Sequence, residues 1–337
     1  MIDLLVAGAG PAGLATALFA AEAGLEVLVL DPRSGPIDKA CGEGLMPGAV
    51  KALTGLGIPL QGMPFAGIRY LDSRRSATAF FRGLGGMGVR RTALQDAMTD
   101  RARQLGVRFE QSGVREVEQH DGLVSAGDHR ARFLVAADGL HSPIRRRLGL
   151  DGRPDPRPRW GLRQHFRVRP WTRLVEVHWG ATCEAYVTPV GPNEIGVAVV
   201  GSTRSPLPQL LQEFPLLSDR LAGVEPTGPV RGAGPLRQRV TRRVAGRVLL
   251  VGDAAGYVDA LTGEGIAVSV ACARSLVDSL VRSRPDDYEW MWRRDTRRYR
   301  WITESLLSTR RFAGPAIVPA AAALPDVFRM AVRQLAR

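Results

Sequence analysis

The stretch that decides the fold is residues 3–31, DLLVAGAGPAGLATALFAAEAGLEVLVLD. A short apolar run, Leu4 to Val6, precedes three glycines spaced G-x-G-x-x-G, an Ala- and Leu-rich segment, and a second apolar run that ends at Asp31. Because Ala and Leu are strong helix formers, this order predicts strand, tight turn, helix and strand. Such a unit binds dinucleotides, since its glycines let a pyrophosphate approach the backbone at the helix N-terminus.

Two groups of residues in this stretch are candidates for nucleotide contact. The turn and the first helical residues offer backbone N–H groups, and they are Gly8, Gly10, Pro11, Ala12 and Gly13. Asp31 stands where a carboxylate accepts a hydrogen bond from a ribose hydroxyl, and we expect Pro32 and Arg33 beside it. The alternative interpretation is an ordinary strand–helix–strand unit without a nucleotide.

The composition is that of an ordinary globular chain. Its 337 residues are 45% hydrophobic, and the mean hydropathy is −0.06. Three widely spaced cysteines, Cys41, Cys183 and Cys272, argue against a disulfide framework or a metal site and for a reducing compartment. We expect a cytoplasmic protein, because the chain starts with the nucleotide-binding strand and no uncharged apolar run is long enough to span a membrane.

The net charge of +13 comes almost entirely from arginine, since Lys39 and Lys51 are the sole lysines. A high-GC genome produces the same bias, in which case the charge is simply solvated. The other interpretations are peripheral contact with the anionic inner membrane surface, an acyl-carrier protein, or an anionic substrate. Nucleic acid is not expected, because the arginines are scattered and no recognition motif accompanies them. The aromatic and basic stretch 288–312 suits either a membrane interface or a helix packed on the protein.

The periodicities predict an α/β (α+β) fold with two interleaved domains. Apolar residues at helical spacing predict helices at 91–105 and 205–222, and residues 160–200 alternate in the manner of antiparallel strands. We expect a Rossmann-like nucleotide-binding domain, an interleaved antiparallel β-sheet substrate domain, and C-terminal helices. The expected ranges are 1–65, 89–152 and 239–284 for the first, 66–88 and 153–238 for the second, and 285–337 for the helices.

Four motifs follow one another in order. They are GAGPAG at 8–13, R-x-x-L at 91–94, AADGLHSPIRRRLG at 136–149 and VGDAAGYVDALTGEGI at 251–266. This succession, which covers about residues 1–280, resembles the FAD-dependent oxidoreductases of the p-hydroxybenzoate hydroxylase and geranylgeranyl reductase superfamily. The resemblance implies that FAD is the cofactor and NAD(P)H the reductant.

The resemblance also assigns the flavin contacts. It implies that Asp253 accepts a hydrogen bond from a ribityl hydroxyl and that Arg91, or its neighbour Arg90, contacts the pyrophosphate. A helix beginning at 263–266 would direct its N-terminal N–H groups at the flavin pyrimidine edge, where they stabilise the negative charge of reduced flavin. The other implied cofactor contacts are Cys41, Gly42, Val114, Asp138, Gly139, Gly252, Gly263, Gly265 and Ile266.

The loop KACGEGL, residues 39–45, resembles the cysteine- and glycine-rich loop that lies against the flavin in the geranylgeranyl reductase branch. Ala40 and Glu43 depart from the Pro-Cys-Gly-Gly-Gly pattern of that branch. Cys41 and Glu43 are the candidate catalytic residues, the thiol as a proton donor and the carboxyl as an acid or base. Alternatively, Cys41 is a small apolar residue packed against the ring. Glu264 is a further acid near the flavin, or a helix cap.

In relatives the second domain walls the substrate pocket, and the implied pocket residues are His165, His178, Tyr186 and Pro189. For a lipophilic small-molecule substrate two chemistries stay open. One is a monooxygenase of secondary metabolism, which hydroxylates an aromatic, polyketide or isoprenoid substrate through a C4a-peroxyflavin. The other is a reductase of prenyl-type double bonds. The short chain and altered loop narrowly favour the monooxygenase, and a non-catalytic basic protein that binds membrane or carrier protein is the remote alternative.

Overall fold

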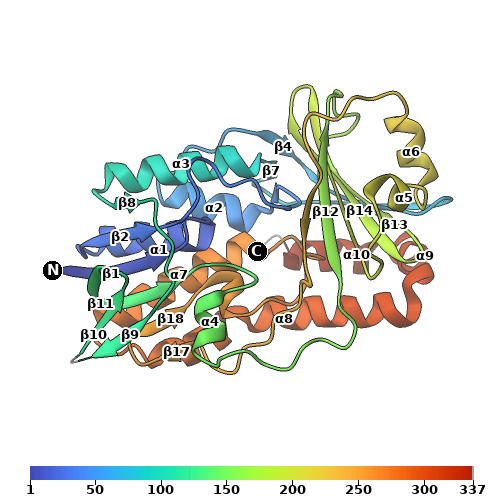
Figure 1. Cartoon of the computed structure of the whole chain (residues 1–337). Helices are drawn as coiled ribbons and strands as arrows, with labels where there is room; N and C mark the ends of the chain where they lie inside the picture. The colour runs from blue at the N-terminus through green and yellow to red at the C-terminus, as the bar shows by residue number, and fades with distance from the viewer. Residues whose placement is uncertain (121, 336–337) are drawn as a thin grey trace.

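The computed structural model of the chain describes residues 1–120 and 122–335. Two lobes stand side by side, one built on a largely parallel sheet and the other on an antiparallel sheet (Figure 1). A long helix, α8 (Asp287–Ala313), runs from the first lobe to the second along one side of the molecule. Helix α8 therefore borders the interface between the two lobes on one side.

The first sheet holds the glycine motif. Its strands follow the order β17-β18-β11-β1-β2-β8, and β10 and β9 extend it antiparallel from β11. The central strand β1 (Ile2–Ala7) pairs in parallel with β2 (Val27–Leu30) and β11 (His129–Ala136). The remaining strands are β8 (Arg108–Glu110), β9 (Glu118–His120), β10 (Leu123–Ala126), β17 (Val244–Ala245) and β18 (Val248–Leu250).

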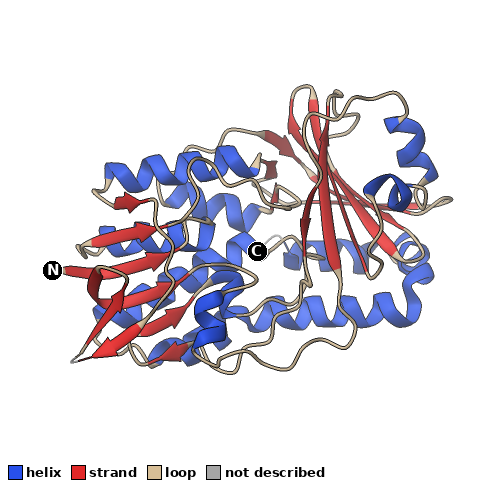
Figure 2. Ribbon diagram, viewed as in Figure 1, coloured by secondary structure: helices blue, strands red, loops and turns tan. Residues whose placement is uncertain are grey.

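The central strands of this sheet are buried on both faces, because helices cover them (Figure 2). Helix α1 (Pro11–Glu22) follows the glycine turn and packs against α7 (Gly265–Val281) and α3 (Arg91–Gln104). The other elements of the lobe are α2 (Pro47–Gly55), α4 (Pro143–Arg147) and the short 3₁₀ turn η1 (Gly252–Ala255). The N-termini of α1 and α7 and the turn η1 thus lie within one packed group.

The second sheet has seven strands in the order β16-β12-β15-β14-β13-β5-β6, and every pairing is antiparallel except that of β13 with β5. Early and late parts of the chain therefore meet in one sheet. Its strands are β5 (Gly67–Leu71), β6 (Ser76–Phe80), β12 (Trp160–Phe166), β13 (Val175–Trp179), β14 (Cys183–Gly191), β15 (Glu194–Gly201) and β16 (Arg231–Ala233).

A small third sheet joins the lobes. It consists of β3 (Gly44–Leu45), β7 (Gly86–Gly88) and β4 (Met63–Phe65). At Gly88 a Cβ atom would lie 1.7 Å from the carbonyl oxygen of Pro189 in β14. Since no side chain fits at that distance, glycine at this position lets the small sheet pack directly on the second sheet.

The two faces of the second sheet contact different helices. Cys183, Ala185 and Val187 of β14 form an outer core with α5 (Leu207–Leu211) and α6 (Pro215–Leu221). The opposite, inner face, which includes Tyr186, packs against the loop that follows η1 and against the C-terminal helices. Beyond α8, those helices are η2 (Gly314–Ala316), α9 (Ile317–Ala323) and α10 (Pro325–Leu335).

The predicted α/β (α+β) class is confirmed, and so is a helix at 91–104. The single helix predicted over 205–222 is wrong, because α5 and α6 are separate and the chain turns between them at Phe214. Pro215 has no N–H to continue the first helix, and it disfavours helical geometry at Phe214, whose φ and ψ are −125° and 73°. Periodic leucines on both sides of the break hide it in the sequence.

No single helix in the described parts of the chain is long and apolar enough to cross a membrane. One pair of helical segments, Asp287–Ala323 with Pro325–Gln334, is long and apolar enough when taken together, but it is bent by 105° between them.

We expect Arg310→Ala to lower the free energy of unfolding by about 3 kcal/mol, because it removes one partner of a buried ion pair. Arg310 is 9% exposed, and it donates to Glu184 Oε2 at 3.2 Å and to the Gly180 carbonyl at 3.0 Å. Its neighbour Arg311 is 29% exposed and lies 4.0 Å from Asp155, so Arg311→Ala is the matched control. Urea unfolding measures both, and equal losses would contradict a structural role for Arg310.

Candidate functional site

The glycine turn after β1 forms a cradle with a fixed shape. Gly8 has a φ of +113°, and a Cβ there would lie 2.5 Å from the carbonyl oxygen of Ala137. A Cβ on Gly13 would lie 1.9 Å from the carbonyl oxygen of Gly8. A Cβ on Gly10, by contrast, would meet no atom nearer than the Nη2 of Arg91 at 3.8 Å. Packing thus requires Gly8 and Gly13, while Gly10 leaves open space at the N-terminus of α1.

Cations converge on that open space. The first turn of α1 has neither an acid nor a side-chain cap, so its N–H groups and partial positive charge are unopposed. Burial, and then the charges of Arg33 and Arg91, lower the pKa of Lys39. The Nε of Arg91 is buried and has no hydrogen-bond partner among the described residues. A diphosphate would satisfy these groups, so the residues present fit the pyrophosphate of FAD.

Of the two arginines that the sequence offers for this contact, Arg91 is the one at the cradle. Arg90 donates to Glu194 Oε1 at 2.7 Å and lies 3.9 Å from Glu43. It therefore joins β15 of the second lobe to the start of α3.

Asp31 lies at the end of β2, as a ribose contact requires. Its Oδ2 accepts hydrogen bonds from the Ala9 N–H and from Arg33, both at 2.9 Å. Burial alone would raise the pKa of Asp31, but the hydrogen bonds from Arg33 and Ala9 hold it below its ordinary value. The carboxylate is therefore ionised and an acceptor at neutral pH. Pro32 approaches the loop at Gly113, next to the half-buried Val114.

Two other expected contacts frame the cradle. Asp138 accepts the Ile144 N–H at 3.2 Å, and its other oxygen is buried without a partner in the described chain. Burial raises the pKa of Asp138. Gly139, at a φ of +88°, passes so close to Lys39 that a Cβ would lie 3.2 Å from the Nζ. The Asp138–Gly139 turn thus holds Lys39 beside the glycine turn.

The turn η1 closes the opposite wall. Gly252, at a φ of +62°, would place a Cβ 2.6 Å from the Cβ of Ala12, so η1 sits directly on the first turn of α1. Burial raises the pKa of Asp253, while Arg91, Lys39 and Arg145 oppose that rise. The carboxyl of Asp253 is therefore near the same cations that face the cradle.

The N-terminus of α7 is also free to face a flavin. Glu264 precedes Gly265 but makes no capping hydrogen bond, and the first turn of α7 holds no acid. Instead, Glu264 Oε1 accepts from Arg298 of α8 at 2.8 Å, and its Oε2 is buried without a partner in the described chain. Burial raises the pKa of Glu264 to about 7. Gly263 and the half-buried Ile266 lie on either side of this acid.

The loop between β2 and β3 is held by a buried pair that the sequence does not predict. Glu43 has a φ of +56°, which is unusual for a side chain larger than glycine. Its Oε2 lies 2.5 Å from His165 Nε2, and both side chains are 1% exposed. Its Oε1 accepts the backbone N–H of Arg91, the first residue of α3, at 2.8 Å. Glu43 therefore links the loop, helix α3 and strand β12.

This pair continues into a longer network. Arg163 Nη1 lies 2.8 Å from His165 Nδ1, and Arg163 also binds Asp38 at the start of the loop. Thr188 of β14 donates to the Gly42 carbonyl at 2.9 Å. One signal is present in the sequence, because Arg163 and His165 alternate on one face of a strand. Their partners Asp38 and Glu43 lie more than 120 positions away in the sequence, and no local pattern in the sequence indicates these contacts.

Cys41 is a half-buried member of the same loop. The Glu43 N–H points at its sulfur, 3.4 Å away. Burial, and in smaller part Tyr299, Asp253, Asp259 and Cys41, raise the pKa of Tyr257, which follows η1.

The expected pocket residues do not all share one face of the second sheet. His165, Gly196 and Thr188 are register partners, as are Arg163, Ala198 and Tyr186, so these two rows point to the inner face. The Tyr186 hydroxyl donates to the Leu261 carbonyl at 3.3 Å. His178 lies on the outer face, 3.4 Å from Glu176 and near Phe214, because Val177 and Trp179 occupy the inner face. The Pro189 backbone is used in packing against Gly88.

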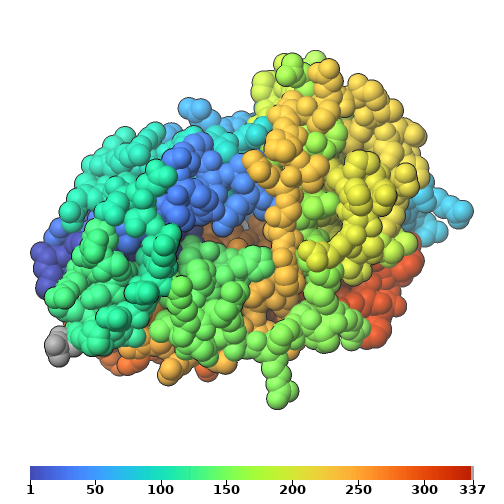
Figure 3. All heavy atoms as spheres, viewed as in Figure 1, coloured from blue at the N-terminus to red at the C-terminus, as the bar shows by residue number. Residues whose placement is uncertain are grey.

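In the space-filling view a hollow opens between the blue N-terminal part, the green segment that includes α4, and the gold segment that precedes β17 (Figure 3). Deeper atoms in the orange range of the sequence form its floor.

A family model, that of the FAD binding domain, matches residues 1–200. The chain is 30% identical to the menaquinone reductase of Mycobacterium tuberculosis over 330 residues, which covers 86% of this chain and 78% of that protein. It is 32% identical to digeranylgeranylglycerophospholipid reductase 1 of Methanopyrus kandleri over 312 residues, with coverages of 85% and 82%.

Solved structures with this fold include a flavoprotein/dehydrogenase from Cytophaga hutchinsonii. Its TM-score is 0.86 at 20% identity, and the match covers 99% of this chain and 92% of that one. The flavin-dependent brominase Bmp2 matches with a TM-score of 0.83 at 17% identity, covering 99% and 93%. At these identities the likeness establishes the fold, a Rossmann-type flavoprotein fold.

We expect Gly10→Ala to weaken FAD binding at least about tenfold while the fold is kept, because a methyl group would enter the space left for the pyrophosphate. Titration of the apoprotein with FAD, followed by flavin fluorescence, measures the affinity. Gly13→Ala is the contrasting variant, since its methyl would strike the Gly8 carbonyl at 1.9 Å and lower the melting temperature. Unchanged FAD affinity in Gly10→Ala would contradict the assignment of the cradle.

The raised pKa of Glu264 has a consequence for stability. Because its folded pKa is about 7 against an unfolded value of about 4.3, its contribution to stability is full at low pH and is lost as the pH rises through the folded pKa. Between about pH 5 and 8 we expect the wild type to lose about 2 kcal/mol more free energy of unfolding than Glu264→Gln. Urea unfolding at both pH values measures this, with the exposed Glu116→Gln as control; parallel pH profiles for wild type and Glu264→Gln would refute it.

Proposed function

Because the chain belongs to the family defined by the FAD binding domain and is an FAD-dependent oxidoreductase, we propose that it reduces prenyl-type carbon–carbon double bonds of a lipophilic substrate. The relatives at 30% and 32% identity, a menaquinone reductase and a digeranylgeranylglycerophospholipid reductase, support this choice. The sequence alone narrowly favours a monooxygenase, and the relatives shift the balance to the reductase. We also propose NAD(P)H as the reductant.

The observation that carries the proposal is the loop 39–43 held between the glycine cradle and the inner face of the second sheet. When bound, FAD supplies the hydride in its reduced form. The free N-terminus of α7 stabilises negative charge on the ring system. The inner face is apolar around Tyr186, with Val175, Val258 and Leu261 in the same cluster, which suits an isoprenoid chain.

The second half of a double-bond reduction is a proton, which a residue of this chain must hold near the substrate. Cys41 is the proposed donor, because it is a half-buried thiol of the loop, whereas the half-buried Asp38 is paired with Arg163 and Arg231. Glu43 is a positioning residue, since its carboxylate is taken up by His165 and by the N–H of Arg91. This division of roles departs from the sequence-based expectation that both residues are catalytic, since it keeps Cys41 alone as the proposed proton donor.

A membrane-dissolved substrate would also explain the apolar residues on the C-terminal helices. Trp301 and Phe312 are 71% and 82% exposed, and Leu324, Val327 and Met330 are each 57% exposed. We propose that a cytoplasmic form of this protein binds peripherally to the inner membrane surface through this region, where arginines are interspersed.

Turnover with and without oxygen separates the two chemistries. Purified protein is reduced by NADPH under anaerobic conditions and mixed with menaquinone or a geranylgeranyl lipid in detergent. Mass spectrometry is expected to find a gain of two hydrogen atoms per reduced double bond. A product that forms solely in air and carries a new oxygen atom would instead establish the monooxygenase, and purified protein without a flavin spectrum would overturn both.

We expect Cys41→Ala to lower the rate of double-bond reduction by a factor of about 10²–10⁴, the usual contribution of a positioned proton donor. The FAD affinity is expected to stay near that of the wild type. The control is Cys183→Ala, which removes a thiol from the outer core. Single-turnover oxidation of the reduced flavin by substrate measures the step, and an unchanged rate in Cys41→Ala would leave the thiol a packing role alone.

A further inference from the structure

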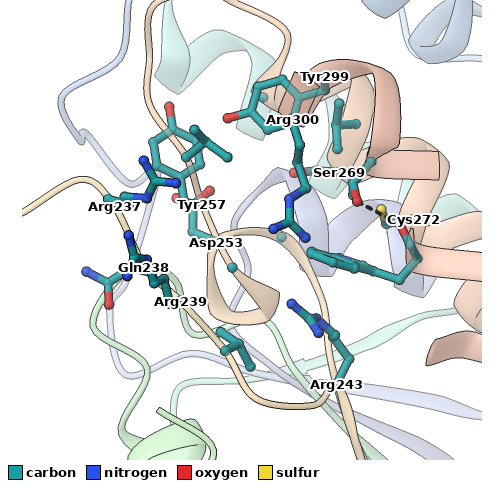
Figure 4. Close-up of a pocket in the computed structure, with 18 of the residues that line it drawn as sticks. Arg237, Gln238, Arg239, Arg243, Asp253, Tyr257, Ser269, Cys272, Tyr299 and Arg300 are labelled. Atoms are coloured by element: carbon teal, nitrogen blue, oxygen red, sulfur yellow. Dashed lines mark hydrogen bonds between the residues drawn. The ribbon is translucent and has the colours of Figure 1, made fainter. Parts of the chain in front are cut away.

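A second pocket lies behind the turn η1. Its volume is about 280 Å³, and it is bounded by η1, by one face each of α7 and α8, and by the segment 237–243 (Figure 4). This volume is below the range of about 300–1,000 Å³ typical of sites for drug-sized ligands, so the pocket suits a small charged group.

The pocket shares a wall with the site assigned to FAD. That wall holds Gly252, Asp253 and Gly265, whereas Lys39 and Arg91, the cations at the glycine cradle, do not line the pocket. Gly252 packs on Ala12 of α1, which is also outside the lining. The turn η1 therefore separates the two spaces.

The charge of the pocket is strongly positive. Four arginines line it, Arg237, Arg239, Arg243 and Arg300, against two acids, Asp253 and Glu304. Arg237 pairs with Glu304, and Arg243 pairs with Glu289 at 3.0 Å. Within the described chain, Arg239 and Arg300 have no carboxylate within 4.0 Å. Two guanidinium groups at this pocket are thus uncompensated.

Trp292 holds two of these cations in place. The guanidinium carbons of Arg243 and Arg300 lie 3.7 Å and 5.3 Å from its ring centroid. Arg243 is 6% exposed, and its Nε donates to the Ala255 carbonyl of η1 at 3.1 Å. Both guanidinium groups point toward the middle of the pocket (Figure 4). Arg243 already pairs with Glu289, so of the two cations on Trp292 it is Arg300 that has no carboxylate partner in the described chain.

We propose that this pocket binds a phosphate-class anion, either free or as the phosphate ester of a nucleotide. The planar guanidinium groups match the oxygens of a phosphate in paired hydrogen bonds. Ser269 and Gln238 also line the pocket, and Gln238 keeps one amide N–H for a ligand beside the one it donates to the Pro235 carbonyl at 2.9 Å. The bound anion would join α7, α8 and η1. The proposal of this anion site does not depend on which substrate or double bond the flavin reduces.

The test is direct binding to the full-length, FAD-loaded protein by isothermal titration calorimetry and thermal shift. The probes are inorganic phosphate, inorganic diphosphate and adenosine 2′,5′-bisphosphate, with chloride at equal ionic strength as the reference. We expect each phosphate probe that binds to raise the melting temperature. A tighter affinity for the bisphosphate identifies a nucleotide ester as the ligand, and equal affinities identify the free anion.

The variants are Arg300→Gln and Arg239→Gln, which remove the uncompensated cations from exposed side chains. We expect each to weaken binding at least about tenfold, because a charge-assisted hydrogen bond is lost. Arg297→Gln, an exposed arginine on the same helix outside the lining, is expected to bind like the wild type. No binding at millimolar concentration, or equal losses in Arg297→Gln, would overturn the proposal. None of these readouts involves turnover, so failure here is separate from failure of the proposed function.

Discussion

The buried pair of Glu43 and His165 connects the parts of the molecule that have to meet. One carboxylate receives the imidazole of β12 and the first N–H of α3, and it does so from the loop that lies beside the glycine cradle. Arg163 can only donate to the imidazole Nδ1, so the neutral imidazole donates from Nε2 to the carboxylate. Removing either partner would leave the other buried and unsatisfied, which costs about 1–3 kcal/mol. The geometry of this pair is met when both lobes, the loop and α3 are all in register. The site is therefore complete only when the fold is complete. The left-handed backbone at Glu43 is a local strain that this arrangement imposes.

The sequence predicts well those turns, helices and strands whose geometry depends on interactions between residues close together in the chain. The glycine spacing near residue 10 can serve only a few backbone geometries, so the turn, α1 and Asp31 lie where they are expected. The same holds for α3, whose apolar spacing is regular. The break at Pro215 escapes prediction because leucine periodicity outweighs one proline. His178 is assigned to the pocket because the second domain walls the pocket in relatives, but membership of that sheet does not tell which of its two faces a side chain occupies. Contacts such as Glu43 with His165 depend on topology, which local patterns in the sequence do not specify.

The arginine excess acquires a structural meaning that composition alone does not provide. Arg145 and Arg163 are each 2% exposed, and Arg243 and Arg310 are nearly as buried. Arg145 donates to Asp151, to the carbonyls of Leu140 and Ala254 and to Gln238, so it joins α4 to η1 and to the segment 237–243. These side chains act as cross-links between backbone segments rather than as a solvated surface. Part of the net positive charge therefore lies inside the protein. A GC-rich genome and the need for cross-links between backbone segments would both favour arginine.

The shared position of β18, η1 and α7 has a consequence for how this protein can be divided. The family model of the FAD binding domain ends at residue 200, but β18 pairs with β11 only after that point, and α7 packs against α1 later still. Strands β5 and β6, in turn, leave the first lobe early and complete the second sheet. A fragment cut at the end of the matched region would lack both the edge of its own sheet and the wall opposite the glycine turn. The region recognised by sequence similarity is therefore not a module that could be transplanted, and recombination of this chain with a relative would have to exchange whole proteins.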